Sequence, residues 1–166
     1  MIILVTGTHN SGKSALAEEL AIGTHDPVRY YLATMEVLDE AGRKRVLKHR
    51  RLREGKGFLT IERTCDVTKA LSDMKDAARS VVLLECMANL VGNEMHRAGS
   101  LEESSFVSRI LGDIQFLAAH VHNLIVVTNT YEKDAEGYDD ATRAYVRMLD
   151  LVNEKLLEYA DAVYRR

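Results

Sequence analysis

Residues 2–14, with the sequence IILVTGTHNSGKS, decide the fold class of this 166-residue chain. The apolar run at 2–6 predicts a buried strand, and it leads directly into Gly7–Ser14, which fits G-x-x-x-x-G-K-[ST] without a gap. The two motif glycines permit the tight backbone geometry that turns successive N–H groups toward one anion. A helix is predicted to follow, and its positive N-terminal end favours the same anion. The sequence therefore predicts a phosphate-binding loop between a strand and a helix.

The side chains of this loop predict a nucleotide and a metal ion as ligands. Lys13 is expected to reach the β- and γ-phosphates, and Ser14 to ligate Mg²⁺. A carboxylate at the end of a neighbouring strand commonly supports such an ion, and Glu85 closes the apolar run at 81–84. The alternative for Glu85 is a strand-end acid that faces solvent. The loop candidates are Gly7, Thr8, His9, Asn10, Ser11, Gly12, Lys13 and Ser14.

Length and composition indicate one cytoplasmic domain. A chain of 166 residues suits a single nucleotide-binding domain spanning 1–166. The net charge of −3 argues against general binding to nucleic acid or anionic membrane. Cys65 and Cys86 show no paired spacing, which predicts free thiols in a reducing compartment. The first residues resemble no targeting segment, and no run approaches the roughly 18 apolar residues of a membrane span.

Short β-branched runs alternate with amphipathic stretches along the chain. The predicted strands are Ile2–Thr6, Val28–Thr34, Leu59–Glu62, Ser80–Glu85 and Leu124–Asn129. The predicted helices are Lys13–Ile22, Glu36–Arg53, Val67–Asp76, Met87–Ala98, Leu101–Val121 and Asp140–Tyr159. Because the central runs are apolar without alternation, the sheet is expected to be mostly parallel and covered on both faces by helices. The expected fold class is α/β, a three-layer P-loop NTPase-like (RecA-like) architecture, with no strand after the last helix.

A dense cluster of basic side chains surrounds His49. On a helix, Arg45, His49 and Arg53 would lie one turn apart on a common face. Neighbouring cations favour neutral, nucleophilic imidazole, and they also bind phosphates. The residues alone leave three interpretations open: a histidine nucleophile, a solvated basic face with an incidental histidine, which they favour, or a nucleic-acid-binding helix. The last is weakened by the net charge and the lack of aromatic side chains in this segment.

Several motifs, taken in order, resemble one known family. They are ILVTG-x4-GKS at 3–14, YLAT at 31–34, RVLKHRRLR at 45–53, TIE at 60–62, LLEC at 83–86 and VVTN at 126–129. Over nearly its whole length the chain resembles the bifunctional adenosylcobinamide kinase/adenosylcobinamide-phosphate guanylyltransferase family of cobalamin biosynthesis. The loop motif alone would be unspecific, whereas the ordered set is not.

The resemblance implies a two-step transferase. In that family one histidine attacks the α-phosphorus of GTP and carries GMP as a phosphoramidate, and the matching position here is His49. The resemblance therefore implies His49 and Lys13 as catalytic residues, Mg²⁺ with GTP or ATP as co-substrate, a corrinoid acceptor and a homotrimer. It implies a metal site at Ser14 and Glu85. The nucleotide-binding candidates outside the loop are Thr34, Met35, Glu36, Arg50, Arg51, Leu52, Arg53, Glu62 and Glu85.

The chain departs from the family pattern mostly where a corrinoid would bind or the site would close. The family typically carries arginine at Asn10, and its VTNE-V-G-x-G-I-V-P stretch is replaced from Thr130 onward by a polar segment expected to form a flap over 132–140. Arg147 and Asp150 also differ, and the sequence lacks the family's final glycine-containing strand and turn. Two other functions stay open at this point: a P-loop kinase of different specificity, and a module that binds GTP without transferring it.

Overall fold

One sheet organises the molecule. The computed structural model describes residues 1–100, 102–132 and 135–166. The strands are β1 (Ile2–Gly7), β2 (Val28–Ala33), β3 (Phe58–Glu62), β4 (Ser80–Glu85), β5 (Asn123–Asn129) and β6 (Ala162–Arg165). They form a six-stranded sheet in the order β3-β2-β4-β5-β1-β6, and all the pairings are parallel.

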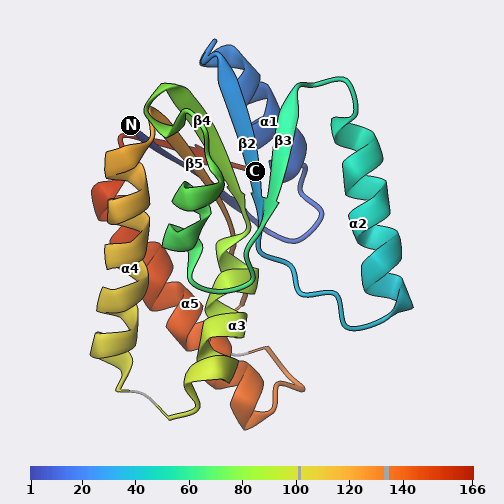
Figure 1. Ribbon diagram of the computed structural model, residues 1–166. Coiled ribbons are helices and arrows are strands. Elements are labelled where there is room, and N and C mark those ends of the chain that lie inside the picture. Colours follow the sequence, from blue (N-terminus) through green and yellow to red (C-terminus); the bar gives the residue numbers. More distant parts are fainter. Residues whose placement is uncertain (101, 133–134) are drawn as a thin grey trace.

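Helices cover both faces of the sheet (Figure 1). They are α1 (Lys13–Gly23), α2 (Glu40–Arg53), α3 (Met87–Ala98), α4 (Glu103–His120) and α5 (Asp140–Tyr159), with the short 3-10 helices η1 (Val67–Asp73) and η2 (Ala77–Arg79). α3, α4 and α5 pack together on one face, and α1 packs against β1, β4 and β5 on the other. The predicted three-layer α/β class is confirmed. In the described part of the chain, none of the helices combines the length and apolar character that crossing a membrane requires.

The core lies between the central strands and the helices. Leu83, Leu84, Ile125 and Val126 have no exposed surface, because helices cover both faces of β4 and β5. Among the described residues, the largest fully buried side chain, Phe106, comes from α4. The apolar runs without alternation therefore predicted these strands correctly.

The structure corrects the predicted elements in several places. The helix predicted over 67–76 is the shorter 3-10 helix η1, where Ser72 donates its hydroxyl to the Lys69 carbonyl, a local bond that competes with α-helix. α2 begins at Glu40 rather than residue 36, because Asp39 caps it by accepting from the Gly42 N–H at 2.7 Å. Residue 101, where the fifth predicted helix begins, lies outside the described residues, as do 133 and 134 of the predicted flap.

The strand β6 was not predicted at all. It is short and half-exposed, so the sequence shows little apolar patterning there. Its pairing with β1 comes from the fold: the Asp161 N–H donates to the Ile2 carbonyl at 2.8 Å, and the Arg166 N–H to the Thr6 carbonyl at 2.9 Å. The prediction that no strand follows the last helix was therefore wrong.

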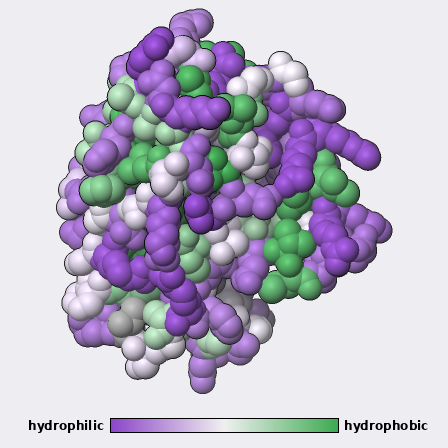
Figure 2. Space-filling model, viewed as in Figure 1, coloured by the Kyte–Doolittle hydropathy of each residue, from purple (hydrophilic) through white to green (hydrophobic). Residues whose placement is uncertain are grey.

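The helix α2 stands apart from the body, at the right of Figure 1. Of its residues only Gly42 and Arg53 are buried. Leu47 and Leu52 are more than half exposed, at 53% and 56%, and Figure 2 shows hydrophobic surface (green) beside hydrophilic surface in this region. The basic segment therefore forms a projecting helix that is attached mainly at its C-terminal end.

Candidate active site

The phosphate loop leaves the buried strand β1 and closes on the first turn of α1. At Gly7 a Cβ atom would lie 2.2 Å from the backbone oxygen of Arg166, so only glycine fits. Gly12, the residue before α1, has φ +87°, a left-handed conformation that favours glycine. Asn10 is exposed and has φ 57°, which asparagine adopts more readily than most residues. The geometry therefore requires both motif glycines and accounts for an asparagine between them.

Lys13, the first residue of α1, is only 6% exposed. Its ammonium donates to the Thr8 carbonyl inside the loop. Burial lowers the pKa of Lys13, and the nearby Cys86 and Glu85 oppose that shift. Among the described residues, no carboxylate lies within ion-pair distance of this ammonium. A buried cation that hydrogen-bonds only a neutral carbonyl is suited to receive an anionic ligand.

Ser14 and Glu85 meet at the carboxyl edge of the sheet. β4 ends at Glu85, and the Ser14 hydroxyl donates to Oε1 of this carboxylate. The second oxygen, Oε2, is buried and has no hydrogen-bond partner. Hydroxyl and carboxylate oxygens are ligands that Mg²⁺ prefers, and this ion usually completes its shell with water and phosphate. The pair therefore fits a Mg²⁺ site that phosphate and water would complete.

A hollow of about 490 Å³ opens between the C-terminal end of α2 and β3. Arg53 is 7% exposed, and its guanidinium carbon lies 3.4 Å from the centroid of the Tyr31 ring. One guanidinium nitrogen, Nη1, is buried and has no hydrogen-bond partner. Arg50 pairs with Glu62 at 2.5 Å beside the same hollow. The lining residues are Arg50, Arg53, Glu54, Gly55, Gly57, Phe58 and Thr60.

His49 lies half-buried on α2. Of the predicted face of Arg45, His49 and Arg53, only Arg53 turns into the body of the protein, and Arg45 is exposed. The hydrogen bonds and ion pairs seen among the described residues include none between His49 and the loop Gly7–Ser14. The structure therefore brings together Lys13 with the loop, Ser14 with Glu85 and Arg50 with Glu62, whereas no hydrogen bond or ion pair among the described residues joins His49 to them.

Thr34 has a structural role in place of the predicted nucleotide contact. It has no exposed surface, and its hydroxyl donates to the Cys86 carbonyl at 2.8 Å while accepting from the Cys86 N–H at 2.7 Å. These bonds join the ends of β2 and β4, which leaves the side chain unavailable to a ligand. The candidates on the surface are Thr8, His9, Asn10, Gly12, Glu36, Arg50, Arg51, Leu52 and Glu62, and those half-buried are Ser11, Ser14, Met35 and Glu85.

Two groups at the site were not predicted as site residues. Tyr31 lies under Arg53, and its pKa is raised strongly by burial and by the charge of Glu85. Asn129 ends β5 beside Gly7 and donates from Nδ2 to the Tyr131 hydroxyl at 3.0 Å. The end of a buried strand marks Asn129 in the sequence, whereas no local pattern marks Tyr31.

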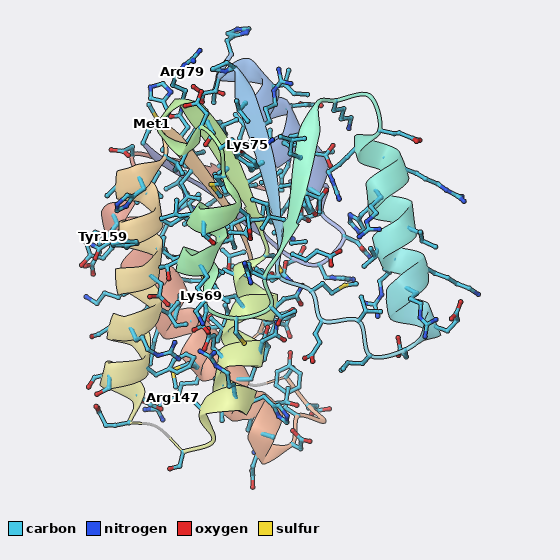
Figure 3. All side chains as sticks on the ribbon, in the orientation of Figure 1. Met1, Lys69, Lys75, Arg79, Arg147 and Tyr159 are labelled. Carbon is cyan, nitrogen blue, oxygen red and sulfur yellow. The ribbon has the colours of Figure 1, made fainter. Side chains whose placement is uncertain are left out.

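Arg147, one of the residues that depart from the family pattern, forms an ion pair outside the phosphate loop. Arg147, labelled in Figure 3 toward the lower end of the molecule, donates to Glu103 at 3.0 Å. Both side chains are well exposed, so the pair joins the surfaces of α5 and α4 and contributes little stability. Arg147 therefore needs no role at the site.

These features define a P-loop nucleotide-binding protein. The sheet is parallel, the loop after β1 is bounded by glycines and holds a buried lysine, and Ser14 pairs with a carboxylate at the end of β4. The comparison with known families is more specific. The chain belongs to the cobinamide kinase / cobinamide phosphate guanyltransferase family, whose model matches residues 3–165. It is accordingly a nucleotide-dependent transferase.

Two curated relatives are similar over almost the whole chain. Both carry the description "Bifunctional adenosylcobalamin biosynthesis protein CobU". The one from Escherichia coli is 30% identical, covering 99% of this chain and 94% of the relative. The one from Salmonella typhimurium is 29% identical, with the same shares covered. Among solved structures, the flagellar accessory protein FlaH from Methanocaldococcus jannaschii has a TM-score of 0.41 and 14% identity, covering 89% of this chain and 67% of FlaH, a likeness too slight to support an argument.

Proposed function

We propose that the chain phosphorylates the side-chain hydroxyl of adenosylcobinamide and then transfers GMP from GTP to that phosphate by way of His49. The observation that carries the proposal is the convergence of Lys13, Ser14 and Glu85 at one edge of the sheet. Membership in the family supplies the acceptor class and the order of the two reactions.

The phosphorylation step uses the loop. The acceptor hydroxyl oxygen attacks the γ-phosphorus of a nucleoside triphosphate, the bond to the β-phosphate oxygen breaks, and the nucleoside diphosphate leaves while the hydroxyl proton passes to water. Lys13 holds the β- and γ-phosphate oxygens, and the N–H groups at the start of α1 hold the same chain. Ser14 and Glu85 hold Mg²⁺, which neutralises phosphate charge when bound.

The guanylyl transfer uses the projecting helix. An imidazole nitrogen of His49 attacks the α-phosphorus of GTP and pyrophosphate leaves. A phosphate oxygen of adenosylcobinamide phosphate then attacks the same phosphorus, the P–N bond breaks, and free His49 returns. Arg50 and Arg53 lie one and four residues further along α2, where their charges stabilise the transferring group. The step requires α2 and the loop-bound nucleotide to approach each other. A movement of α2 is possible because only two of its residues, Gly42 and Arg53, are buried.

The hollow beside Arg53 is proposed as the nucleotide's second contact region. The buried Nη1 of Arg53 has an unmet donor, which a ligand oxygen or ring nitrogen satisfies. Tyr31 is close to both this hollow and Glu85. Its ring lies under Arg53, and its pKa is raised by burial and by the charge of the Glu85 carboxylate. One nucleotide can therefore contact both the loop and the α2 side of the site.

We also propose that residues 1–166 act as one domain in a cytoplasmic homo-oligomer, a trimer by family resemblance. The exposed Leu47 and Leu52 on a projecting helix support association, since contact between copies would bury them. Sedimentation velocity tests this, and a monomer at micromolar concentration would contradict it.

The proposed function is tested by product analysis. The protein is incubated with adenosylcobinamide, GTP or ATP, and Mg²⁺, and the corrinoid products are separated and weighed by mass spectrometry. The expected products are adenosylcobinamide phosphate and then adenosylcobinamide-GDP. The matched control is Lys13→Ala, which is expected to form both products more slowly than the wild type. Phosphate without the GDP product would identify a kinase alone, and no product at all would contradict the proposal.

A further inference from the structure

The strand between the loop and Glu85 ends in an unassigned group of side chains. β5 lies between β1 and β4, with Asn129 paired to Gly7 and Val127 paired to Glu85. The Thr130 N–H donates to the Gly7 carbonyl at 3.0 Å, which extends the pairing one step beyond the strand. Residues 129–131 therefore leave the sheet beside both the phosphate loop and the proposed metal site.

Tyr131 folds back over this strand end. Its hydroxyl accepts from Asn129 Nδ2 at 3.0 Å, and its ring centroid lies 6.2 Å from that of Tyr145 on α5, at 56°. Tyr145 donates its hydroxyl to the Ala88 carbonyl at 2.9 Å, in the first turn of α3, three residues after Glu85. Both tyrosines are half-buried. The two rings thus span from the end of β5 to the start of α3 and leave part of their surface open to a ligand.

The two flanks of the loop differ in chemistry. The β2–β3 flank presents Arg50 and Arg53, one of them with an unmet donor, and suits a polyanionic nucleotide. The β5–α5 flank presents the Tyr131–Tyr145 pair, whose rings suit a large organic molecule and whose hydroxyls suit its polar groups. In the proposed function the triphosphate lies along the loop between the two flanks, so an acceptor that attacks its end would approach from the tyrosine flank.

We propose that Tyr131 contacts the acceptor and determines its affinity, with Tyr145 as the second face of the same platform. This inference rests on the proposed function, and it concerns a residue in the stretch where the chain departs from its family. The ligand is a large, hydroxyl-bearing organic acceptor of low negative charge, which the proposed function identifies as adenosylcobinamide. Tyr131 supplies ring contact and a hydroxyl, and Asn129 positions that hydroxyl.

Two substitutions separate the ring from the hydroxyl. Tyr131→Phe keeps the ring and is expected to raise the acceptor KM about fivefold, the effect of one neutral hydrogen bond. Tyr131→Ala removes both and is expected to raise it about tenfold or more. The KM and Kd for the nucleotide should change less than about twofold in both variants, since the nucleotide lies on the other flank. Circular dichroism and thermal unfolding confirm that each variant folds.

Tyr159→Phe is the matched control, because it removes a hydroxyl from the other end of α5. Tyr159 lies at the left side of Figure 3 and is 44% exposed, about 21 Å along the helix from Tyr145. Adenosylcobinamide binding is measured directly by equilibrium dialysis, alongside turnover. If the wild type binds adenosylcobinamide and Tyr131→Ala binds it with the same affinity, the inference is overturned and the proposed function stands. An equal loss of nucleotide affinity would also overturn it, and no corrinoid binding by the wild type would overturn the proposed function and the inference together.

Discussion

Glu85→Gln tests the proposed metal site with the smallest change of shape. The substitution keeps the size of the side chain and an oxygen that can accept from Ser14, but it removes the charge. The other oxygen, Oε2, which is buried without a hydrogen-bond partner, is replaced by the uncharged amide nitrogen of glutamine. The proposal predicts that the variant folds and needs much more Mg²⁺ for turnover.

The magnitude follows from the loss of one charged ligand. Contacts to a charged group contribute about 1.5–3 kcal/mol in proteins, and a metal ligand lies toward the upper end. A loss of about 2–3 kcal/mol corresponds to an increase of about 30- to 150-fold in the Mg²⁺ concentration at half-maximal rate. The pKa of Lys13 falls further in the variant, because the negative charge of Glu85 is one of the influences that raise it.

The assay is a Mg²⁺ titration of the phosphorylation rate at saturating nucleotide. Glu19→Gln is the control, since Glu19 is an exposed carboxylate on α1. A folded Glu85→Gln protein with the wild-type Mg²⁺ requirement would refute the reasoning and would assign Glu85 to another contact.

Three further substitutions have expected outcomes. Lys13→Ala should weaken nucleoside triphosphate binding by about 1.5–3 kcal/mol, measured by calorimetric titration; unchanged affinity would remove Lys13 from the site. Arg53→Ala should lower the free energy of unfolding by about 1–2 kcal/mol in urea, because it removes a buried stack on an aromatic ring, and it should also weaken nucleotide binding. Asp26→Asn should destabilise the protein at pH 7: burial raises the pKa of Asp26, but hydrogen bonds from Asn123 and His122 outweigh it and lower that pKa. A lowered carboxyl pKa stabilises above the unfolded value of about 3.9 and the benefit fades below it, so wild type and variant should converge in unfolding free energy under acid conditions.

Local patterns were enough to predict most of the sheet. The runs at 2–6, 80–85 and 124–129 are apolar because both faces are covered, and the structure places β1, β4 and β5 there. The loop was predictable because its motif is short and uninterrupted. Gly12 is required by its own left-handed backbone conformation, whereas Gly7 is also required by the Arg166 backbone oxygen, which the motif does not show.

The rest depends on distant contacts that no local pattern records. β6 forms because it pairs with the edge of β1. Thr34 has a structural role because its hydroxyl bonds the backbone of Cys86 at the end of the neighbouring strand β4. The stack of Arg53 on Tyr31 joins a helix end to a strand 22 positions earlier in the chain. The basic segment predicted a helix with His49 and Arg53 on one face, but only the tertiary structure shows that Arg53 is buried and that α2 projects.

The central claim is that His49 carries GMP, and one labelling experiment tests it directly. The protein is incubated with Mg²⁺ and GTP labelled at the α-phosphorus, and the chain is recovered under denaturing conditions. The proposal predicts label that acid removes and alkali spares, as for a phosphorus–nitrogen bond to imidazole. His49→Ala should abolish the label, whereas His120→Ala, at an exposed histidine whose ring bonds the Phe116 carbonyl, should retain it. An unlabelled wild-type chain, or label that persists in His49→Ala, would contradict guanylyl transfer through His49.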